Sequence, residues 1–579
     1  MAGTPLRATW ELRTRAGIAE TWALLSDTER FNRAVGFGFR FEEQPVEDGP
    51  ARRFGTARFL GMNLRWEELP FQYTQFKWYK WERIFEGGPA ARLTGTLRLR
   101  PEAEGTGILY TLEVFPRSVF VGPAVAFELY VRTKPRIDRA LNDCVALLDG
   151  GEIVLEPLPE PLGATEAAAL AASVARMPDP EFAKALAGFI DQAPLSEQDG
   201  ISPLRLAREW RMPVDQAIRG CLSAVREGAL TLSWDLLCPL CLSPKQSVDR
   251  LAAAGRVHCP ACNITYDGTF ADSVSVRFRT APALRRFQVD TACVGSPARQ
   301  PHIVAQDRVE GGATHTFELE LQPGLYRLRT SRSRDVASIS VGEEGAHGVQ
   351  IPMGGDASVS GRLELQRGPA TLSVHNEGHA ALGVMLERRS LPPDALTAGQ
   401  LLECPGAAEL LPEGAVDPTQ RTETLRAAVL AVEMPGQGQE RLVAEQERLV
   451  ALGARRVQLR AGQLVASFDA LDSALEASLP LGHAPGTRVA LSLGALLEVT
   501  VADGSTTQLG AAVERALTAM WGASPGKLAL PTELAGDPEL LEILRRRGLR
   551  LEPVGLAVSP TQRVHWLALS APRALAARA

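Results

Sequence analysis

The chain has 579 residues, of which 45% are hydrophobic and 22% are charged, and its formal net charge at pH 7 is −6. A chain of this length is too long for one hydrophobic core, so we expect about three to five domains. The composition is ordinary for a globular protein, and so small a net charge excludes a global attraction to nucleic acid or anionic membranes. Because no apolar run approaches a membrane span and the first residues lack the apolar core of a signal peptide, we expect a cytoplasmic protein.

Residues 1–150 predict a domain of strands placed between an early helix and a closing helix. The run GIAETWALLSDTERFNRAVG has apolar residues at helical spacing, with Asp27 and Thr28 as polar interruptions. Strand-like runs follow, among them FQYTQFKWYKWERIFEGG, and AVAFELYVRTKPRIDRALNDCVALL has the pattern of a closing helix. The Pro-rich acidic stretch 151–163 then predicts a linker.

Residues 164–237 predict a mostly helical segment with the outline of a winged helix: a helix, a turn, a longer helix and a strand. A DNA-binding regulator acting through this segment therefore stays open as an alternative function. The longer helix, VDQAIRGCLSAVREG, lacks the clustered Arg and Lys face that phosphate contacts need, so we do not expect nucleic acid as a partner.

Two C-P-x-C pairs lie within residues 238–271, and their spacing is typical of a zinc ribbon. Two residues between the cysteines let both thiolates reach one ion from a tight turn, and a second such turn completes a tetrahedral site. We therefore predict one structural Zn²⁺ held by Cys238, Cys241, Cys259 and Cys262. Because four thiolates leave no coordination position for water, we expect the ion to brace the fold and to catalyse nothing.

The rest of the chain predicts a sandwich, a linker and a final α/β domain. Short runs such as HTFELEL and ATLSVHN, separated by Gly, Pro and Asn turns, predict a β-sandwich over residues 272–390. We expect a connecting helix and linker over residues 391–421, and an α/β domain over residues 422–572. The expected fold class is therefore multidomain α+β.

The order of elements in residues 1–150 resembles the START-like helix-grip family, also called the polyketide-cyclase-like or SRPBCC superfamily. The resemblance implies a curved antiparallel sheet around the closing helix, with an apolar cavity between them. Aromatic side chains crowd two of the strands, and five of them are candidates for a hydrophobic ligand pocket: Trp66, Tyr73, Phe76, Trp78 and Trp81. The same residues suit an aromatic core or a domain interface equally well.

Several runs in residues 422–572 resemble, in order, parts of the class III nucleotide cyclases, the adenylate and guanylate cyclases. AAVLAVEMPG resembles the first metal-binding strand, and GARRVQLRAGQLVASFDALDSALEAS resembles the second hairpin. RVALSLGALLEV and LGAAVERALTA resemble a later strand and the helix that follows it. A START-like domain, a middle module with C-P-x-C pairs and a cyclase domain is also an arrangement found in bacterial cyclase-like proteins. The resemblance implies a ferredoxin-like α/β domain that pairs with a second copy or with an active partner.

Other residues occupy the positions that carry catalysis in that family. The resemblance places Glu433 and Gly462 at the positions of the two metal-binding aspartates. Gln458 stands in place of the purine-reading lysine, and Glu514 in place of the transition-state asparagine. Thr518 stands in place of the family's arginine. Losing a metal ligand and the phosphate-orienting groups removes the electrostatic positioning on which this chemistry depends. The link between Glu433 and Gly453 is also shorter than the family's by about a helix, which implies the loss of part of the phosphate-binding loop and of the helix that follows it.

We therefore predict a cytoplasmic signalling or scaffold protein with a catalytically inactive cyclase-homology domain and a hydrophobic small molecule as the ligand of its START-like domain. We expect a homodimer or a heterodimer through the cyclase-homology domain. A weakly active class III cyclase making cyclic AMP or cyclic GMP stays open as an alternative. It would use Mg²⁺ or Mn²⁺ held by ligands recruited from elsewhere, such as Asp469 or Glu498.

Overall fold

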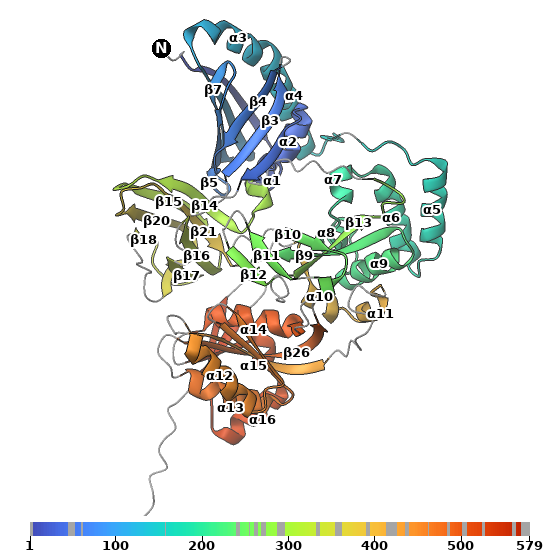
Figure 1. Ribbon diagram of the computed structural model, residues 1–579, viewed down its shortest axis with the longest axis vertical. Helices are drawn as coiled ribbons and strands as arrows, with labels where there is room; N and C mark the ends of the chain where they lie inside the picture. The colour runs from blue at the N-terminus through green and yellow to red at the C-terminus, as the bar shows by residue number, and fades with distance from the viewer. Residues whose placement is uncertain are drawn as a thin grey trace, which may run out of the picture.

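The computed structural model covers the chain in segments, and every structural statement below refers to the residues it describes. Four regions follow one another: an N-terminal module, a largely helical middle module, a β-sandwich and a C-terminal α/β module (Figure 1). The expected multidomain fold of mixed helices and sheets is confirmed. Within the described segments, no helix is both long and apolar enough to cross a membrane. The described residues are 4–44, 52–59, 62–156, 158–238, 244–253, 255–259, 264–267, 274–286, 296–331, 336–353, 362–389, 394–412, 425–434, 439–460, 463–482, 487–500, 506–523, 527–557 and 563–568.

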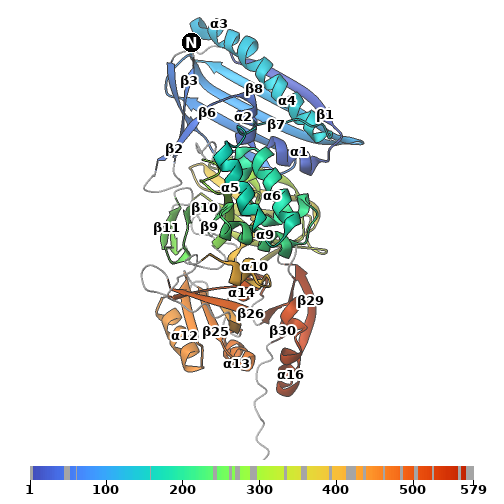
Figure 2. The ribbon, with the colours of Figure 1, turned by 90° about the vertical axis from the view of Figure 1, so that its right-hand side faces the viewer.

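An antiparallel sheet with the strand order β1-β8-β7-β6-β4-β3-β2 forms the body of the N-terminal module. Helix α4 lies across this sheet (Figure 2). The strands are β1 (Leu6–Thr14), β2 (Arg40–Gln44), β3 (Arg52–Phe59), β4 (Met62–Glu68), β6 (Trp78–Phe85), β7 (Ala90–Glu102) and β8 (Gly105–Pro116). The helices are α1 (Ile18–Leu25), α2 (Thr28–Val35), α3 (Gly122–Phe127) and α4 (Lys134–Leu148).

Both helices expected in this module are present, and each is interrupted once. The early helix is divided because the Asp27 side chain accepts a hydrogen bond from the Arg30 backbone N–H at 3.1 Å and so caps a new helix, α2. The closing helix is confirmed as α3 and α4, joined by the π-helical turn η2 (Glu128–Thr133). Pro135 has no N–H to donate, and the widened turn directly before it accommodates that loss.

The core of the N-terminal module lies between the sheet and the helices. Side chains alternate along β8, so that Ile108, Tyr110 and Leu112 point inward. They are buried in one cluster with Trp22 of α1 and Leu141 of α4. Burying these apolar and aromatic surfaces stabilises the contact between sheet and helices.

The middle module combines helices with the sheet β10-β9-β13-β22. The predicted order of a helix, a longer helix and a strand is confirmed by α8, α9 and β9. Strand β13 lies within the stretch 272–390 but pairs with β9, so it belongs to this sheet and not to the sandwich. The helices are α5 (Ala164–Ala175), α6 (Pro180–Gln192), α7 (Leu195–Gln198), α8 (Pro203–Glu209) and α9 (Val214–Arg226). The strands are β9 (Leu230–Leu237), β10 (Pro244–Val248), β13 (Val274–Thr280) and β22 (Leu396–Thr397).

Two sheets form the sandwich, and their inner faces share one apolar cluster. The first contains β14 (Ile303–Val309), β21 (Leu382–Arg388), β16 (Gly324–Thr330), β17 (Ala337–Gly342) and β19 (Arg362–Gln366). The second contains β15 (Thr314–Leu321), β20 (Gly368–Asn376) and β18 (Gly348–Met353). The first sheet continues into the N-terminal module, because β14 also pairs with the short strand β5 (Gln72–Thr74).

The C-terminal module is a sheet of order β24-β25-β23-β26-β28-β30-β29 covered by helices on both faces. Residues of β23 (Leu425–Glu433) alternate between the two layers: Val429 packs in the cluster with α14, whereas Leu430 packs in the cluster with α12, α13 and α16. One helix, α12, lies in the link between Glu433 and Gly453. The helices are α12 (Gln439–Ala451), α13 (Leu471–Gly482), α14 (Ala511–Gly522), α15 (Thr532–Ala535) and α16 (Pro538–Arg547). The other strands are β24 (Arg456–Arg460), β25 (Gln463–Phe468), β26 (Arg488–Thr500), β27 (Thr506–Leu509), β28 (Lys527–Pro531), β29 (Leu551–Ala557) and β30 (Arg563–Ala568).

Candidate functional site

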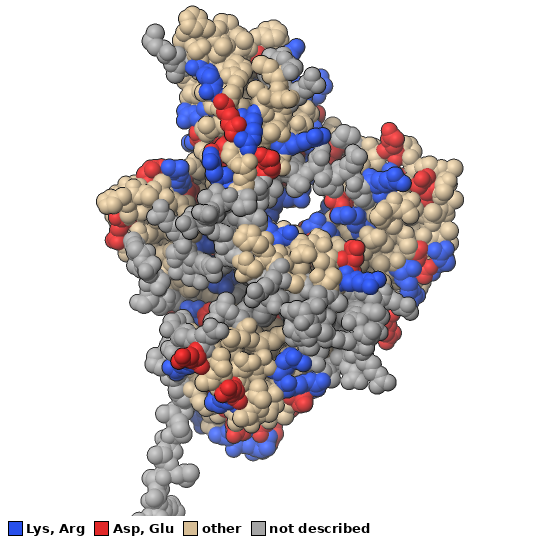
Figure 3. Space-filling model, viewed as in Figure 1, with Lys and Arg blue, Asp and Glu red and all other residues tan. Residues whose placement is uncertain are grey.

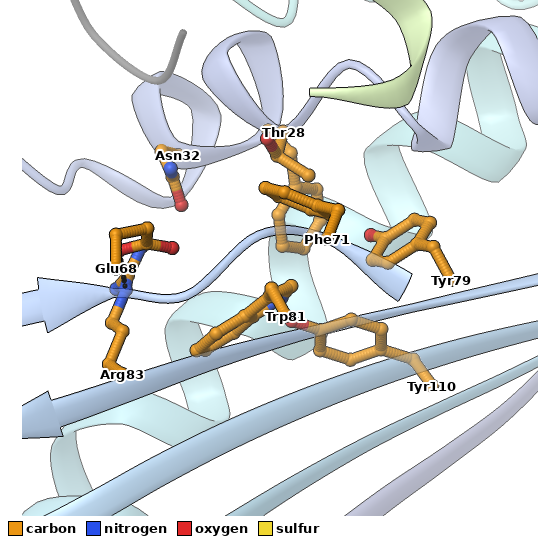
Figure 4. Close-up of a pocket in the computed structure, with 9 residues that line it drawn as sticks. Thr28, Asn32, Glu68, Phe71, Tyr79, Trp81, Arg83 and Tyr110 are labelled. Atoms are coloured by element: carbon orange, nitrogen blue, oxygen red, sulfur yellow. Dashed lines mark hydrogen bonds and ion pairs between the residues drawn. The ribbon is translucent and has the colours of Figure 1, made fainter. Parts of the chain in front are cut away.

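A small cavity lies in the N-terminal module between α2 and the sheet (Figure 4). Its volume of about 10 Å³ corresponds to the space for roughly one water molecule. A cavity of this size does not hold a lipid or a large aromatic ligand as it stands. Its lining is formed by Thr28, Phe31, Asn32, Glu68, Phe71, Tyr79, Trp81, Arg83 and Tyr110.

A buried ion pair forms one end of this cavity. Glu68 of β4 and Arg83 of β6 are opposite each other in the strand register, and Arg83 Nε donates to Glu68 Oε2 at 2.8 Å. The indole N–H of Trp66 donates to the same oxygen at 2.8 Å. The other oxygen, Glu68 Oε1, is buried and has no hydrogen-bond partner among the described residues. The cavity therefore contains a carboxylate oxygen that can accept one more hydrogen bond.

The guanidinium of Arg83, the cation of this pair, lies against three aromatic rings. The Arg83 guanidinium lies 4.5 Å from the ring centroids of both Phe39 and Trp81, and 5.2 Å from that of Trp66. Cation–π contacts of this kind compensate part of the cost of burying the charge. Burial also raises the pKa of Tyr110, at the opposite end of the cavity, to about 12, so its phenol stays protonated at neutral pH.

The five aromatic pocket candidates occupy different environments. Trp81 lines the cavity, whereas Trp66 lies behind the lining and contacts Glu68 and Arg83. Tyr73 is buried at the junction with the sandwich. Phe76 has a left-handed backbone with φ 64°, and its ring centroid lies 6.2 Å from that of Trp22. Trp78 is half-buried and lies on the opposite face of β6 from Trp81. Sequence reasoning missed Glu68 and Arg83, whose only signal was a pair of charges within strands of otherwise aromatic composition.

The wall of the cavity is hydrogen-bonded to the following modules. The backbone N–H of Thr28 donates to Ser296 Oγ at 3.2 Å, and the Ser296 hydroxyl donates to the Ser26 carbonyl at 2.5 Å. The Gln306 side chain donates to the Phe71 carbonyl at 2.7 Å. Thr28 and Phe71 both line the cavity, so two of its walls are attached directly to the segment that opens the sandwich.

A buried charge cluster lies beside the same junction. Glu387 of β21 accepts hydrogen bonds from Arg327 at 2.6 Å and from Arg329 at 2.5 Å. Burial by itself would raise the pKa of Glu387, but Arg329 and Arg327 outweigh it and hold this pKa below its ordinary value. Burial raises the pKa of Tyr73 on β5, and the nearby charge of Glu387 adds to the rise. The pairing of β14 with β5 therefore joins the N-terminal module to the sandwich, and the charge cluster lies within the sandwich beside this pairing.

The two described cysteines of the predicted zinc site lie at strand ends. Cys238 directly follows β9, and Cys259 ends β11 (Arg256–Cys259), which pairs with β12 (Ile264–Asp267). Both thiols are fully buried. Cys241 and Cys262 lie outside the described residues, and within those residues no group of three His, Cys, Asp or Glu side chains could hold an ion. The four-cysteine site stays a prediction.

Glu433, at the end of β23, is engaged by neighbouring strands. Its carboxylate accepts from the Arg488 guanidinium at 2.9 Å and from the Gln463 amide at 3.0 Å. Gly462 lies outside the described residues. Gln458 is half-buried on β24 and pairs in register with Val465. A metal ion at Glu433 would have to compete with a guanidinium that already neutralises it.

The carboxylate of Glu514, on α14, supports the helix that leads into this module. It accepts hydrogen bonds from the Thr397 hydroxyl at 2.8 Å and from the Gly399 backbone N–H at 3.1 Å, at the N-terminus of α10 (Ala398–Glu403). Arg515 donates to Glu403 at 2.6 Å, near the other end of the same helix. Thr518 is half-buried one turn further along. These two side chains of α14 therefore hold α10 in place.

Asp469 and Glu498 are the two carboxylates that the sequence suggested as recruited metal ligands. Asp469 is exposed and pairs with Arg455 at 3.4 Å. Glu498 lies on β26, and its side chain is outside the described residues. No described contact brings Asp469 to Glu433.

Helix α9, which would read DNA in a winged helix, is packed inside the middle module. Seven of its 13 residues are buried, among them Cys221 and Leu222. Its neighbours in the core include Phe182 of α6 and Leu206 of α8. A helix buried to this degree offers little face to a DNA groove.

Comparison with family models finds one match. Residues 164–301 match a family of unknown function (DUF5939). This stretch is less than half of the chain and covers the helical middle module and the whole of the cysteine region, residues 238–271. No curated protein matches the chain.

Among solved structures, the chain is similar to several chains, each over about a quarter of its own length. The protein TTHA0849 of Thermus thermophilus is 20% identical, with a TM-score of 0.20, and the match covers 25% of this chain and 98% of that one. The Zhui aromatase/cyclase of a Streptomyces species is 15% identical, with a TM-score of 0.21, over 25% and 94% of the two chains. The guanylyl cyclase domain of the RhoGC fusion protein from the aquatic fungus Blastocladiella emersonii, as a double mutant, is 10% identical, with a TM-score of 0.21, over 26% and 97%. Scores this low carry no argument, so the case for function depends on the residues themselves.

Proposed function

We propose that this chain is a cytoplasmic signalling or scaffold protein with a START-like, helix-grip domain at its N-terminus and a non-catalytic, ferredoxin-like cyclase-homology domain at its C-terminus. The N-terminal domain binds a small ligand and reports its presence to the next module. The observation that carries this proposal is that Thr28 and Phe71 line the cavity and are themselves bonded to Ser296 and Gln306. A ligand that moves either wall must disturb those contacts.

The ligand we propose is mainly apolar and carries one hydrogen-bond donor. The aromatic lining supplies apolar contact, and Glu68 Oε1 supplies an acceptor that lacks a partner among the described residues. Because the cavity holds about one water molecule, such a ligand enters only when α2 moves away from the sheet.

Two probes that differ in one donor test this ligand class. We expect 2-naphthol to bind the full-length protein roughly tenfold more tightly than 2-methoxynaphthalene, since a hydrogen bond to a charged acceptor is worth about 1.5–3 kcal/mol. The variant Glu68→Gln should reduce that difference, and Glu113→Gln, on β8 and partly exposed, should leave it unchanged. Equal binding of the two probes to the wild-type protein would contradict the proposal.

The C-terminal domain acts, in this proposal, by binding and not by cyclising nucleotides. Support comes from Glu433, which Arg488 already neutralises, and from Glu514, which caps α10. Incubating the protein with ATP or GTP and Mn²⁺ should give no cyclic AMP or cyclic GMP above the Glu433→Ala variant. Product above that background would favour the weakly active cyclase.

Dimerisation through this domain is a further part of the proposal, and analytical ultracentrifugation of the full chain tests it.

We also propose a structural zinc ion held by Cys238, Cys241, Cys259 and Cys262. The buried thiols of Cys238 and Cys259 at the ends of two strands support it. The purified protein should contain one zinc per chain, and Cys259→Ser should lose the metal and much of its thermal stability. The control Cys404→Ser changes a buried thiol outside the ribbon and should keep the zinc. A metal-free wild-type protein would end this proposal.

The DNA-binding alternative is opposed by the burial of α9. If it held, duplex DNA would bind with strong salt dependence, and deleting residues 201–237 would abolish that binding.

A further inference from the structure

A helical segment at the far end of the N-terminal module exposes large apolar side chains. It consists of the 3₁₀ turn η1 (Val119–Val121), α3 and η2, and it lies at the top of the molecule in Figure 1, at the opposite end from α12 and α13. The exposed fractions are 49% for Val119, 91% for Phe120, 55% for Phe127, 42% for Tyr130 and 56% for Val131. An almost completely exposed Phe within such a group is uncommon on a globular surface.

The segment is amphipathic, and its apolar side chains divide between two faces. Val125 and Leu129 are four residues apart and point into the core, where their exposed fractions are 6% and 2%. Phe120, Phe127 and Val131 are separated by seven and four residues, which places them on the other face of the helical segment. We call this exposed face, from Val119 to Val131, the apolar tip.

The chain around the apolar tip carries more basic than acidic residues. Residues 117–139 contain five Arg and Lys and only two acidic residues, a net charge of +3 within a chain whose net charge is −6. Arg132 follows the tip directly and is 54% exposed, with Glu128 3.8 Å away. In Figure 3 the top of the N-terminal module is mainly uncharged surface bordered by basic side chains. The whole chain is weakly acidic, but this one end of it is positive.

We propose that the apolar tip docks on a membrane surface that contains anionic lipid, with the helical segment lying in the interface. Exposed Phe and Val beside Arg and Lys is the combination that peripheral helices use, because apolar burial and attraction to anionic headgroups act together. Such docking is peripheral and agrees with the finding that no described helix is suited to span a bilayer.

Charge argues against a second copy of this chain as the occupant. Two tips packed face to face would bring two surfaces of net charge +3 together, which costs free energy unless a counter-ion lies between them. An anionic surface complements the same charge. The proposal goes beyond the ligand and scaffold function, since neither the cavity nor the C-terminal domain takes part in it.

Vesicle sedimentation of the full-length protein tests the docking. The wild-type chain should sediment with vesicles of phosphatidylcholine mixed with phosphatidylserine, less with phosphatidylcholine alone, and less as salt is raised. The double variant Phe120→Ser with Phe127→Ser should lose roughly tenfold or more in vesicle affinity, because both side chains lose their apolar burial. Arg132→Glu should weaken binding chiefly at low salt.

A matched control separates docking from general loss of apolar surface. Val450→Ser with Leu541→Ser removes two exposed apolar side chains of the C-terminal module, 55% and 46% exposed, and should bind vesicles as the wild type does. Unchanged melting temperatures would show that all variants fold. The proposal is overturned if the wild type binds no vesicle, or if the Phe120 and Phe127 double variant binds as the wild type does. It is also overturned if that double variant converts a dimer into a monomer, since the tip would then be a protein interface.

Discussion

The N-terminal and C-terminal modules are joined to the middle of the chain in different ways. At the N-terminal junction a strand pairs with a strand, and Ser296 and Gln306 bond to the walls of a cavity. At the C-terminal junction, side chains of α14 hold α10, with the Glu514 carboxylate bonded to the Thr397 hydroxyl and the Gly399 backbone N–H. In the first module Glu68 Oε1 has no hydrogen-bond partner among the described residues, whereas in the second Glu433 and Glu514 accept hydrogen bonds from neighbouring residues. Polar groups with no internal partner indicate a binding site better than the position of a residue in a family motif does.

The largest effect is expected at the buried carboxylate beside the N-terminal junction. Glu387→Ala leaves Arg327 and Arg329 buried without their carboxylate, which should cost about 3–5 kcal/mol of unfolding free energy. Chemical denaturation of the full chain measures it. Glu318→Ala removes an exposed carboxylate whose contact with Lys77 is 3.8 Å long, and it should change stability very little. Equal effects of the two variants would show that the buried cluster does not stabilise the protein.

Acid should weaken the same charge cluster. The folded pKa of Glu387 lies below its ordinary value, so its contribution to stability is complete above about pH 4.5 and is lost as pH falls through the folded pKa. The wild-type protein should therefore lose stability in acid more steeply than Glu387→Gln, which cannot ionise. Thermal melts of both proteins between pH 7 and pH 3 compare the slopes. Parallel slopes would assign the acid sensitivity to other carboxylates.

A moderate effect is expected at the C-terminal junction. Glu514→Ala removes the acceptor for the Gly399 N–H and the Thr397 hydroxyl, and the loss of such a cap costs about 1–2 kcal/mol. Hydrogen exchange at Gly399 should accelerate with it. Glu533→Ala, an exposed residue at the start of α15, is the control and should leave that exchange unchanged. A stable protein with slow exchange at Gly399 would mean that α10 is held by its apolar contacts alone.

Local patterns predicted the elements of this chain, but not their partners. The closing helix follows from apolar spacing, and the break between α1 and α2 follows from Asp27, whose capping bond spans three residues. The pairing of β13 with β9 could not be predicted, because a short apolar strand fits either neighbouring sheet and only its register selects one. For the same reason Glu68 and Arg83 were missed: they are 15 residues apart and meet only because β4 and β6 pair in one register.

A smaller effect is expected where Ser296 meets the cavity wall. Ser296→Ala removes one hydrogen bond to the Ser26 carbonyl and one from the Thr28 N–H, worth about 1 kcal/mol in total after hydration. Exchange of the Thr28 amide should be faster in this variant. Ser373→Ala, which removes an exposed contact to Thr316 in the sandwich, should leave that amide unchanged. If the Thr28 amide is equally protected in both variants, the cavity wall is independent of the next module.

The smallest effect on stability is expected at Glu433. A variant there also distinguishes a non-catalytic domain from a weakly active cyclase. Arg488→Ala breaks a half-buried ion pair, so the unfolding free energy should fall by at most about 1 kcal/mol. Among the described residues, the same change leaves the Gln463 amide as the one hydrogen-bond donor to the Glu433 carboxylate. A metal ion would then no longer compete with the Arg488 guanidinium for that carboxylate. If the domain retained a latent cyclase site, Mn²⁺ would now bind and support some product. We expect neither, because one carboxylate does not make a two-metal site. Glu514 is not free to become a second ligand, since its carboxylate accepts hydrogen bonds from Thr397 and Gly399 at the start of α10.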